Sequence, residues 1–336
     1  MRIDTLAHVS RLGDGIAQIR LPMTNHPMRY VNAYLIEDDD GPTLVDCGWR
    51  ADDVLVALHA GLAACHTRLE DLARVIITHA HFDHYGLAGT LRRAGLRALL
   101  MHPAEWAFAQ QHFSDIMGFD HIADAWIARN GFTSDYGEVD PDAFFHHRVE
   151  LTEPTGLVED GERIGRLRAI WTPGHTPGHL CFLDERSGEM LTGDHVLDPV
   201  TPHVGMWTPG GSDRIGNYIA SLEKVKAIGA RGVLPAHGEP WVDLAARVDQ
   251  LLAHEAERER RIIAILERAP ADAGTVAAGL TWTRKERAFD LLSPEHQQFA
   301  VAETLAHLEH LRWTNRATRE ESATPITYTL TSPTQT

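Results

Sequence analysis

Four side chains that could bind a metal ion lie within six residues at the end of an apolar strand. The segment reads Thr78-His79-Ala80-His81-Phe82-Asp83-His84 and follows Val75-Ile76-Ile77. Alternate side chains of an extended backbone point to the same side, so His79 and His81 face one way. The turn that follows lets Asp83 and His84 face the same space. Neutral imidazole nitrogens suit zinc, at distances of about 2.0–2.1 Å. The segment therefore predicts a metal site.

Three further turns carry a histidine or an aspartate in the same kind of place. His175 lies in Thr172-Pro-Gly-His-Thr-Pro-Gly-His179, Asp194 in Leu191-Thr-Gly-Asp-His195, and His237 in Leu234-Pro-Ala-His-Gly238. Each turn contains proline or glycine and follows a predicted strand. Histidines on unrelated surface loops would not be expected to recur at strand ends, so these turns are predicted to contribute to the same site.

The first 250 residues alternate short apolar runs with helical patterns, which is typical of an α/β protein built in layers. Strands are predicted at 16–21, 31–36, 42–45, 74–78, 98–101, 163–171, 180–184, 189–192 and 232–235, and helices at 51–64, 85–94 and 213–228. Residues 104–150 interrupt this pattern and are rich in aromatic side chains, among them Trp106 and Phe113. Such an insertion serves either as helical packing against the core or as the wall of a pocket.

The C-terminal part has a different organisation. A long charged helix is predicted at 242–267, a composition break follows at Ala269-Pro270, and a helix at 296–313 precedes a β-hairpin at 316–330. Helix, helix and hairpin indicate a small winged-helix-like module. Residues 251–336 hold 10 basic and 12 acidic side chains, so a structural, dimeric or substrate-facing role is favoured over DNA reading. We predict a catalytic domain over 1–250, and a linking helix with a winged-helix-like domain over 251–336.

Composition excludes several classes of protein. The 336 residues suit about two domains. A net charge of −16 makes nucleic acid an unexpected partner, because its phosphates need a basic face. Three scattered cysteines form no disulfide framework or C-x-x-C pair, no apolar leader follows Met1, and no apolar run could span a membrane. We expect a soluble, cytoplasmic protein with a small-molecule substrate, and leave open a homodimer.

The ligand pattern His79-x-His81-x-Asp83-His84, His175, Asp194 and His237 resembles the signature of the metallo-β-lactamase-fold hydrolases, in order, over about residues 15–245. The resemblance implies an αβ/βα sandwich with metals at one edge between two mixed sheets. The winged-helix-like tail further resembles a branch with thioesterase-like, hydroxyacylglutathione hydrolase-like and endoribonuclease-like members.

Carried over to this chain, the resemblance implies two divalent metal ions, zinc first, with iron or manganese as alternatives. His79, His81 and His175 would bind one ion, Asp83, His84 and His237 the other, and Asp194 would bridge both. Asp83 and Asp194 are thus the predicted catalytic carboxylates. The two ions would share a hydroxide that attacks a carbonyl or phosphoryl centre.

Other nearby residues are given supporting roles. Asp46, in Asp46-Cys47-Gly48, resembles the family's Asp-x-Gly turn and is predicted to support a ligand. His179 and His195 flank ligand positions and are expected to pack or to support them. Substrate contacts are assigned to Trp106 and Phe113, while Tyr218 is weighed between packing and substrate contact.

The predicted reaction is hydrolysis of a thioester or small ester, of the acyl-CoA or hydroxyacylglutathione type. A lactonase is an alternative, although the tyrosine that family lactonases carry shortly after the bridging aspartate is absent. A metal-dependent ribonuclease is disfavoured by the acidic charge. A persulfide dioxygenase with one iron held by two histidines and an aspartate also stays open.

Overall fold

The computed structural model describes residues 8–133 and 149–331. The chain forms two compact units. The first comprises Met1–Ile116, Pro141–Pro202 and Ser221–Val248, and the second comprises Met117–Asp140, His203–Ala220 and Asp249–Thr336. All seven predicted metal ligands belong to the first unit.

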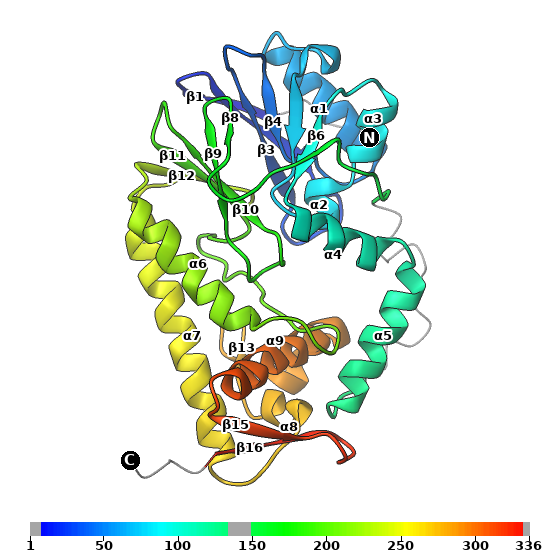
Figure 1. Ribbon diagram of the computed structural model, residues 1–336, viewed down its shortest axis with the longest axis vertical. Coiled ribbons are helices and arrows are strands. Elements are labelled where there is room, and N and C mark those ends of the chain that lie inside the picture. The colour runs from blue at the N-terminus through cyan, green and yellow to red at the C-terminus, as the bar shows by residue number, and fades with distance from the viewer. Residues whose placement is uncertain (1–7, 134–148, 332–336) are drawn as a thin grey trace. The chain divides into compact units, whose positions relative to one another are not determined.

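Two β-sheets form the centre of the first unit (Figure 1). The 7-stranded sheet has the order β1 to β7, and the 5-stranded sheet has the order β12-β11-β10-β9-β8. The strands are β1 His8–Gly13, β2 Ile16–Pro22, β3 Tyr30–Ile36, β4 Thr43–Val45, β5 Arg74–Ile76, β6 Leu99–Met101, β7 Gly156–Leu157, β8 Arg163–Ile164, β9 Leu167–Trp171, β10 Leu180–Asp184, β11 Glu189–Gly193 and β12 Gly232–Pro235. β1 and β7 lie outside the predicted strands.

Strand β3 shows why the two sheets pack face to face. Val31, Ala33 and Leu35 belong to the apolar cluster beneath the helices, while Tyr34 and Ile36 belong to the cluster shared with the second sheet. Successive side chains of a strand point to opposite faces, so this apolar strand is buried on both sides. The αβ/βα sandwich expected from the sequence is confirmed.

Helices cover the outer face of the first sheet. They are α1 Asp52–Ala64, α2 Phe82–Tyr85, α3 Ala88–Arg93 and α4 Pro103–Phe113, with a 3₁₀ turn at Leu69–Asp71. α1 lies so close to β2 that a Cβ on Gly61 would stand 2.4 Å from Ile19. The helix predicted at 85–94 instead divides into α2 and α3, because Leu87 donates its backbone N–H to Gly48.

The strand predicted at 163–171 is in fact the hairpin β8–β9. Gly165 at its turn has a φ of 58°, a region that favours glycine. A Cβ at Gly165 would also stand 1.9 Å from an Asp38 oxygen. Backbone conformation and space therefore both require glycine here, which ends one strand and begins the next.

The second unit contains helices and two short hairpins. Its elements are α5 Ile116–Arg129, α8 Ala273–Ala278, β13 Thr281–Trp282, β14 Arg287–Ala288, a 3₁₀ turn at Phe289–Leu291, α9 Pro294–Trp313, β15 Ala317–Glu320 and β16 Thr327–Leu330, together with parts of α6 Arg214–Ile228 and α7 Leu244–Leu266. α8, α9 and the β15–β16 hairpin follow in the order expected of the tail.

The aromatic insertion predicted at 104–150 is divided between the two units. α4 belongs to the first unit and residues 117–133 to the second. The physical reason is backbone pairing: Gly274 donates to the carbonyl of Asn130 at 3.0 Å, and Ile326 donates to Arg129 at 2.9 Å. Residues 134–148 of the insertion, with Tyr136, Phe144 and Phe145, lie outside the described residues.

Candidate metal centre

The predicted ligands come together where strands of the two sheets end. β4, β5 and β6 run parallel, as do β11 and β12, so their carboxyl ends reach common edges. Asp46 follows β4, the His79–His84 segment follows β5, and His175, Asp194 and His237 follow β9, β11 and β12. Segments far apart in the sequence therefore supply one site.

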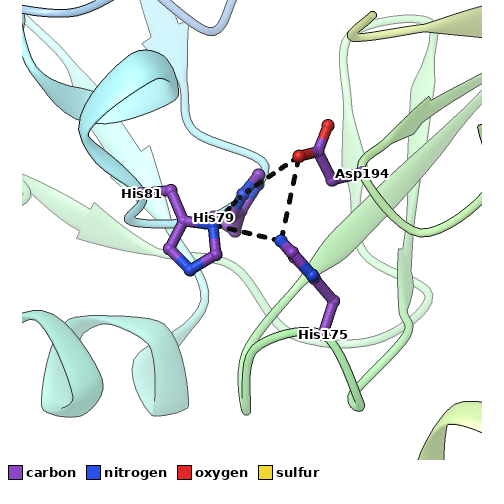
Figure 2. Close-up of side chains that lie close together, drawn as sticks. All are labelled: His79, His81, His175 and Asp194. Atoms are coloured by element: carbon purple, nitrogen blue, oxygen red, sulfur yellow. Dashed lines mark hydrogen bonds and ion pairs between the residues drawn. The ribbon is translucent and has the colours of Figure 1, made fainter. Parts of the chain in front are cut away.

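The first group of potential ligands consists of His79, His81, His175 and Asp194 (Figure 2). His81 Nδ1 lies 3.0 Å from His79 Nε2 and 3.1 Å from His175 Nε2. Asp194 Oδ2 lies 4.0 Å from His79 Nε2 and 3.8 Å from His175 Nε2. Three ring nitrogens and one carboxylate oxygen thus surround one point.

Asp83, His84 and His237 form the second group. Asp83 Oδ2 lies 3.6 Å from His84 Nε2 and 3.3 Å from His237 Nε2. The other oxygen of Asp194, Oδ1, lies 3.6 Å from His84 Nε2 and 3.5 Å from His237 Nε2. The Asp194 carboxylate therefore stands between the two groups and turns one oxygen toward each.

Asp46 determines which ring nitrogens of His79 and His84 remain available. Its carboxylate, which only accepts, takes the Thr78 hydroxyl at 2.9 Å and His84 Nδ1–H at 2.8 Å. Because the Thr78 hydroxyl proton is used in this way, its oxygen accepts from His79 Nδ1–H at 3.0 Å. The Nε2 lone pairs of both histidines are thereby left to face the site. The supporting role predicted for Asp46 agrees with this geometry.

His237 is oriented in the same way by the first sheet. Its Nδ1–H donates to the carbonyl of Tyr30 at 3.1 Å, which leaves Nε2 as the acceptor. Asn32 on β3 holds the turn around it, because its amide donates to the carbonyls of Pro235 at 2.9 Å and Gly238 at 2.8 Å. A backbone acceptor or carboxylate behind a ligating histidine is the usual partner at metal sites.

Two buried atoms at the centre have no hydrogen-bond partner among the described residues: Asp194 Oδ1 and His84 Nε2. A buried polar atom without a partner is costly, and a cation would satisfy both. Two groups of imidazole and carboxylate ligands that share one carboxylate fit a pair of divalent ions. Zinc, iron and manganese all accept this ligand set.

Electrostatics keep four of the ligands, His79, His81, Asp83 and Asp194, in the states that bind cations. Burial, together with the neighbouring imidazoles, holds the pKa of His79 and of His81 well below the usual range, so both rings stay neutral. Burial opposes ionisation of Asp83, but His84 and His237 outweigh it and lower its pKa to about 2. The pKa of Asp194 is also held well below its usual range, since the same two histidines outweigh burial.

His179 and His195 lie beside the site without joining either group. His179 Nδ1–H donates to the Thr172 hydroxyl at 2.8 Å, and its Nε2 accepts the backbone N–H of Asp194 at 3.2 Å. It thus holds the bridging aspartate through the main chain. His195 is fully buried, and burial lowers its pKa to about 3, so it packs as a neutral ring. Tyr218 is likewise buried, on α6.

The aromatic side chains of α4 differ in their distance from the ligands. The ring of Phe108 lies 6.5 Å from that of His81, edge to face, and is only partly buried. The ring of His112 contacts both Phe108, at 5.1 Å, and Phe113, at 5.0 Å. Phe113 is thus linked to Phe108 through His112. Trp106 packs against the core. Substrate contact by Trp106 and Phe113 stays a prediction.

Four functional candidates do not stand out in the sequence: Thr78, Asn32, Phe108 and Glu105. Asn32 carried a recognisable signal, since it is the one amide in the apolar run Val31-Asn-Ala-Tyr-Leu-Ile36. Glu105 carried a weaker signal, because an acidic residue in the first turn of a helix is common.

Comparison with known proteins agrees with this geometry. Residues 26–237 match the family model described as the metallo-beta-lactamase superfamily, and the chain belongs to this superfamily. It is 24% identical over 307 residues to the probable metallo-hydrolase YqjP of Bacillus subtilis (strain 168), which covers 89% of this chain and 92% of that protein.

Two further proteins are similar to this chain, one in its structure and one over part of its sequence. The crystal structure of the metallo-beta-lactamase family protein TTHA1429 from Thermus thermophilus superposes with a TM-score of 0.79 at 28% identity, covering 96% of this chain and 100% of that one. The atrochrysone carboxyl ACP thioesterase dmxR1 of Cryptosporiopsis sp. (strain 8999) is 30% identical over 138 residues, 40% of this chain and 39% of that protein.

The chain is therefore a member of a metallo-hydrolase superfamily with a site that fits two metal ions. Among the described residues, no helix combines the length and apolar character that crossing a lipid bilayer requires.

Proposed function

We propose that this protein is a hydrolase that uses two divalent metal ions, zinc first, to cleave a thioester or a small ester. The observation that carries the proposal is Asp194, whose two oxygens face separate groups of ligands. When bound, two such ions lower the pKa of a water molecule and polarise the oxygen of a carbonyl or phosphoryl group.

The chain's own residues orient the ligands and shape the surroundings. Asp46, Thr78 and the Tyr30 carbonyl hold Nδ1 of His84, His79 and His237, so the Nε2 atom of each ring faces the site. His179 fixes the backbone of Asp194. Because two bound ions would supply the attacking water, the site needs no serine or cysteine nucleophile. Cys181 is also unsuited to act as a nucleophile, because burial raises the pKa of its thiol to about 12.

An acyl substrate is favoured by the apolar surroundings of His81. Phe108 is partly buried, and its ring lies beside the His81 ring. The name of the relative dmxR1 is consistent with thioester hydrolysis. The order of α8, α9 and the β15–β16 hairpin supports a winged-helix-like module in the second unit.

The experiment that tests the proposal is a substrate panel measured on the purified, metal-loaded protein. The panel holds acyl-CoA esters of increasing length, a hydroxyacylglutathione, a lactone, a phosphodiester and a persulfide. We expect turnover on thioesters that is lost on chelation and restored by zinc. Preferred turnover of the lactone, the phosphodiester or the persulfide would replace the thioester assignment with the corresponding activity.

Phe108→Ala tests whether this side chain contacts the acyl chain of the substrate. Burying an apolar chain gains about 0.8 kcal/mol per CH₂, so removing the ring should raise KM for long-chain substrates and spare short ones. Leu91→Ala, at a buried apolar position of α3, is the control and should cost stability without a dependence on chain length. The assignment fails if Phe108→Ala lowers kcat equally on every substrate and leaves KM unchanged.

A further inference from the structure

A buried carboxylate on α4 joins the two turns that carry the histidines of the first group. Glu105 is 0% exposed. Its Oε1 accepts the backbone N–H of Ala80 at 2.7 Å. Its Oε2 accepts the Thr176 hydroxyl and the backbone N–H of Gly178, both at 2.8 Å.

These donors alternate with ligands along the chain. Ala80 lies between His79 and His81, and Thr176 directly follows His175. Each oxygen of Glu105 therefore holds one of the two turns. The turns come from different sheets, because one follows β5 and the other follows β9.

The fit between α4 and the second turn is close. A Cβ on Gly178 would stand 2.2 Å from the backbone nitrogen of Glu105, so a side chain at this position would push the helix away. The start of α4 is also fixed by its N-cap, since His102 Nδ1 accepts the backbone N–H of Ala104 at 3.1 Å. Glu105 is therefore held rigidly as well as buried.

We propose that Glu105 is a positioning residue that sets the separation of His79 and His81 from His175, and so sets the affinity of the first group for its ion. The inference rests on the proposed metal-dependent function. The second group has other supports, because Asp46 orients His84 and the Tyr30 carbonyl orients His237. Loss of Glu105 should therefore affect the two groups unequally.

Glu105→Gln is the direct test. The amide oxygen can still accept from Thr176 and Gly178, but the NH₂ group then faces the N–H of Ala80, and two donors repel. In a zinc titration against a competing chelator, we expect one binding step to weaken by roughly 10–100-fold, as when an outer partner of a ligand is lost. The affinity of the other step should stay within about threefold of that of the unaltered chain, because a substitution that does not touch a site usually changes free energies by less than about 0.5 kcal/mol.

Thr176→Val removes a single donor to Glu105 and provides a second test if Glu105→Gln does not fold. It should weaken the same step, by less. Matched controls lie at the other end of β10, where Asp184 is buried and accepts the Ser187 hydroxyl at 3.0 Å. Both variants act at the end of β10 away from the ligands: Ser187→Ala removes one donor, and Asp184→Asn also weakens the buried ion pair with Arg166. They should lower the melting temperature and leave both zinc steps unchanged.

The outcomes separate the two claims. If the unaltered chain takes up no zinc, the proposed function fails. If it takes up two ions and the Glu105 and Thr176 variants do the same with unchanged affinities, only the role of Glu105 fails. That role also fails if both steps weaken equally, or if the Asp184 and Ser187 variants weaken one step as much.

Discussion

Replacing Asp194 with asparagine should reduce turnover by about a thousandfold, since metal stabilisation of the transition state is worth several kcal/mol and each 1.36 kcal/mol is a factor of ten. The carboxylate places one oxygen 3.8 Å from His175 Nε2 and the other 3.5 Å from His237 Nε2. An amide of the same shape keeps one oxygen. Its NH₂ group would donate to the imidazole lone pairs of one group, so that group should lose its ion. Initial rates and bound metal, measured on one preparation, give both effects.

His195→Ala is the control at the neighbouring position. His195 is buried and belongs to neither ligand group, so its replacement should lower stability while most turnover remains. Equal loss of turnover in the two variants would show that Asp194 has no special position between the ions.

Asp46→Asn should weaken zinc binding by roughly 10–100-fold, the usual cost of losing the partner behind a ligating histidine. Asp46 Oδ1 accepts the backbone N–H of Thr78 at 2.8 Å, so the amide oxygen of asparagine is needed there. The NH₂ group would then face His84 Nδ1. The histidine must accept at Nδ1 and carry its proton on Nε2, where the ion should bind. Excess zinc should restore much of the activity.

Backbone strain does not complicate this variant, because Asp46 has a φ of 61° and asparagine tolerates that region as well as aspartate. Asp184→Asn again supplies the matched control, as a buried carboxylate at the far end of β10. Unchanged zinc affinity in Asp46→Asn, with the same loss of melting temperature as the control, would contradict the proposed orientation of His84.

The ligands could be predicted from the sequence because their geometry is mostly local. His79 and His81 share a side of one extended segment, and His175, Asp194 and His237 each follow a strand whose apolar pattern is clear. The same patterns predict a layered α/β protein, and the resemblance to the metallo-β-lactamase fold implied the sandwich. Glu105 could not be predicted in this way, since its three donors lie 25, 71 and 73 residues away.

The division of the aromatic insertion between the two units also could not be predicted from the local sequence pattern. Nothing in the sequence pattern separates residues 117–133 from the rest of the insertion, yet the backbone bonds of Arg129 and Asn130 to Ile326 and Gly274 assign them to the second unit. Phe108 could not be singled out for a similar reason. Trp106, Phe108 and Phe113 look alike in the sequence, and tertiary structure decides that Phe108 contacts His81.

The number of metal ions per chain is the most direct test of the central claim. The measurement is elemental analysis of the purified protein, before and after dialysis against a chelator and again after zinc is restored, with thioester turnover followed in parallel. The two ligand groups predict about two divalent ions per chain, lost together with activity and regained with it. Full activity with one equivalent of redox-active iron, or with no metal, would contradict a hydrolase with two ions joined by Asp194.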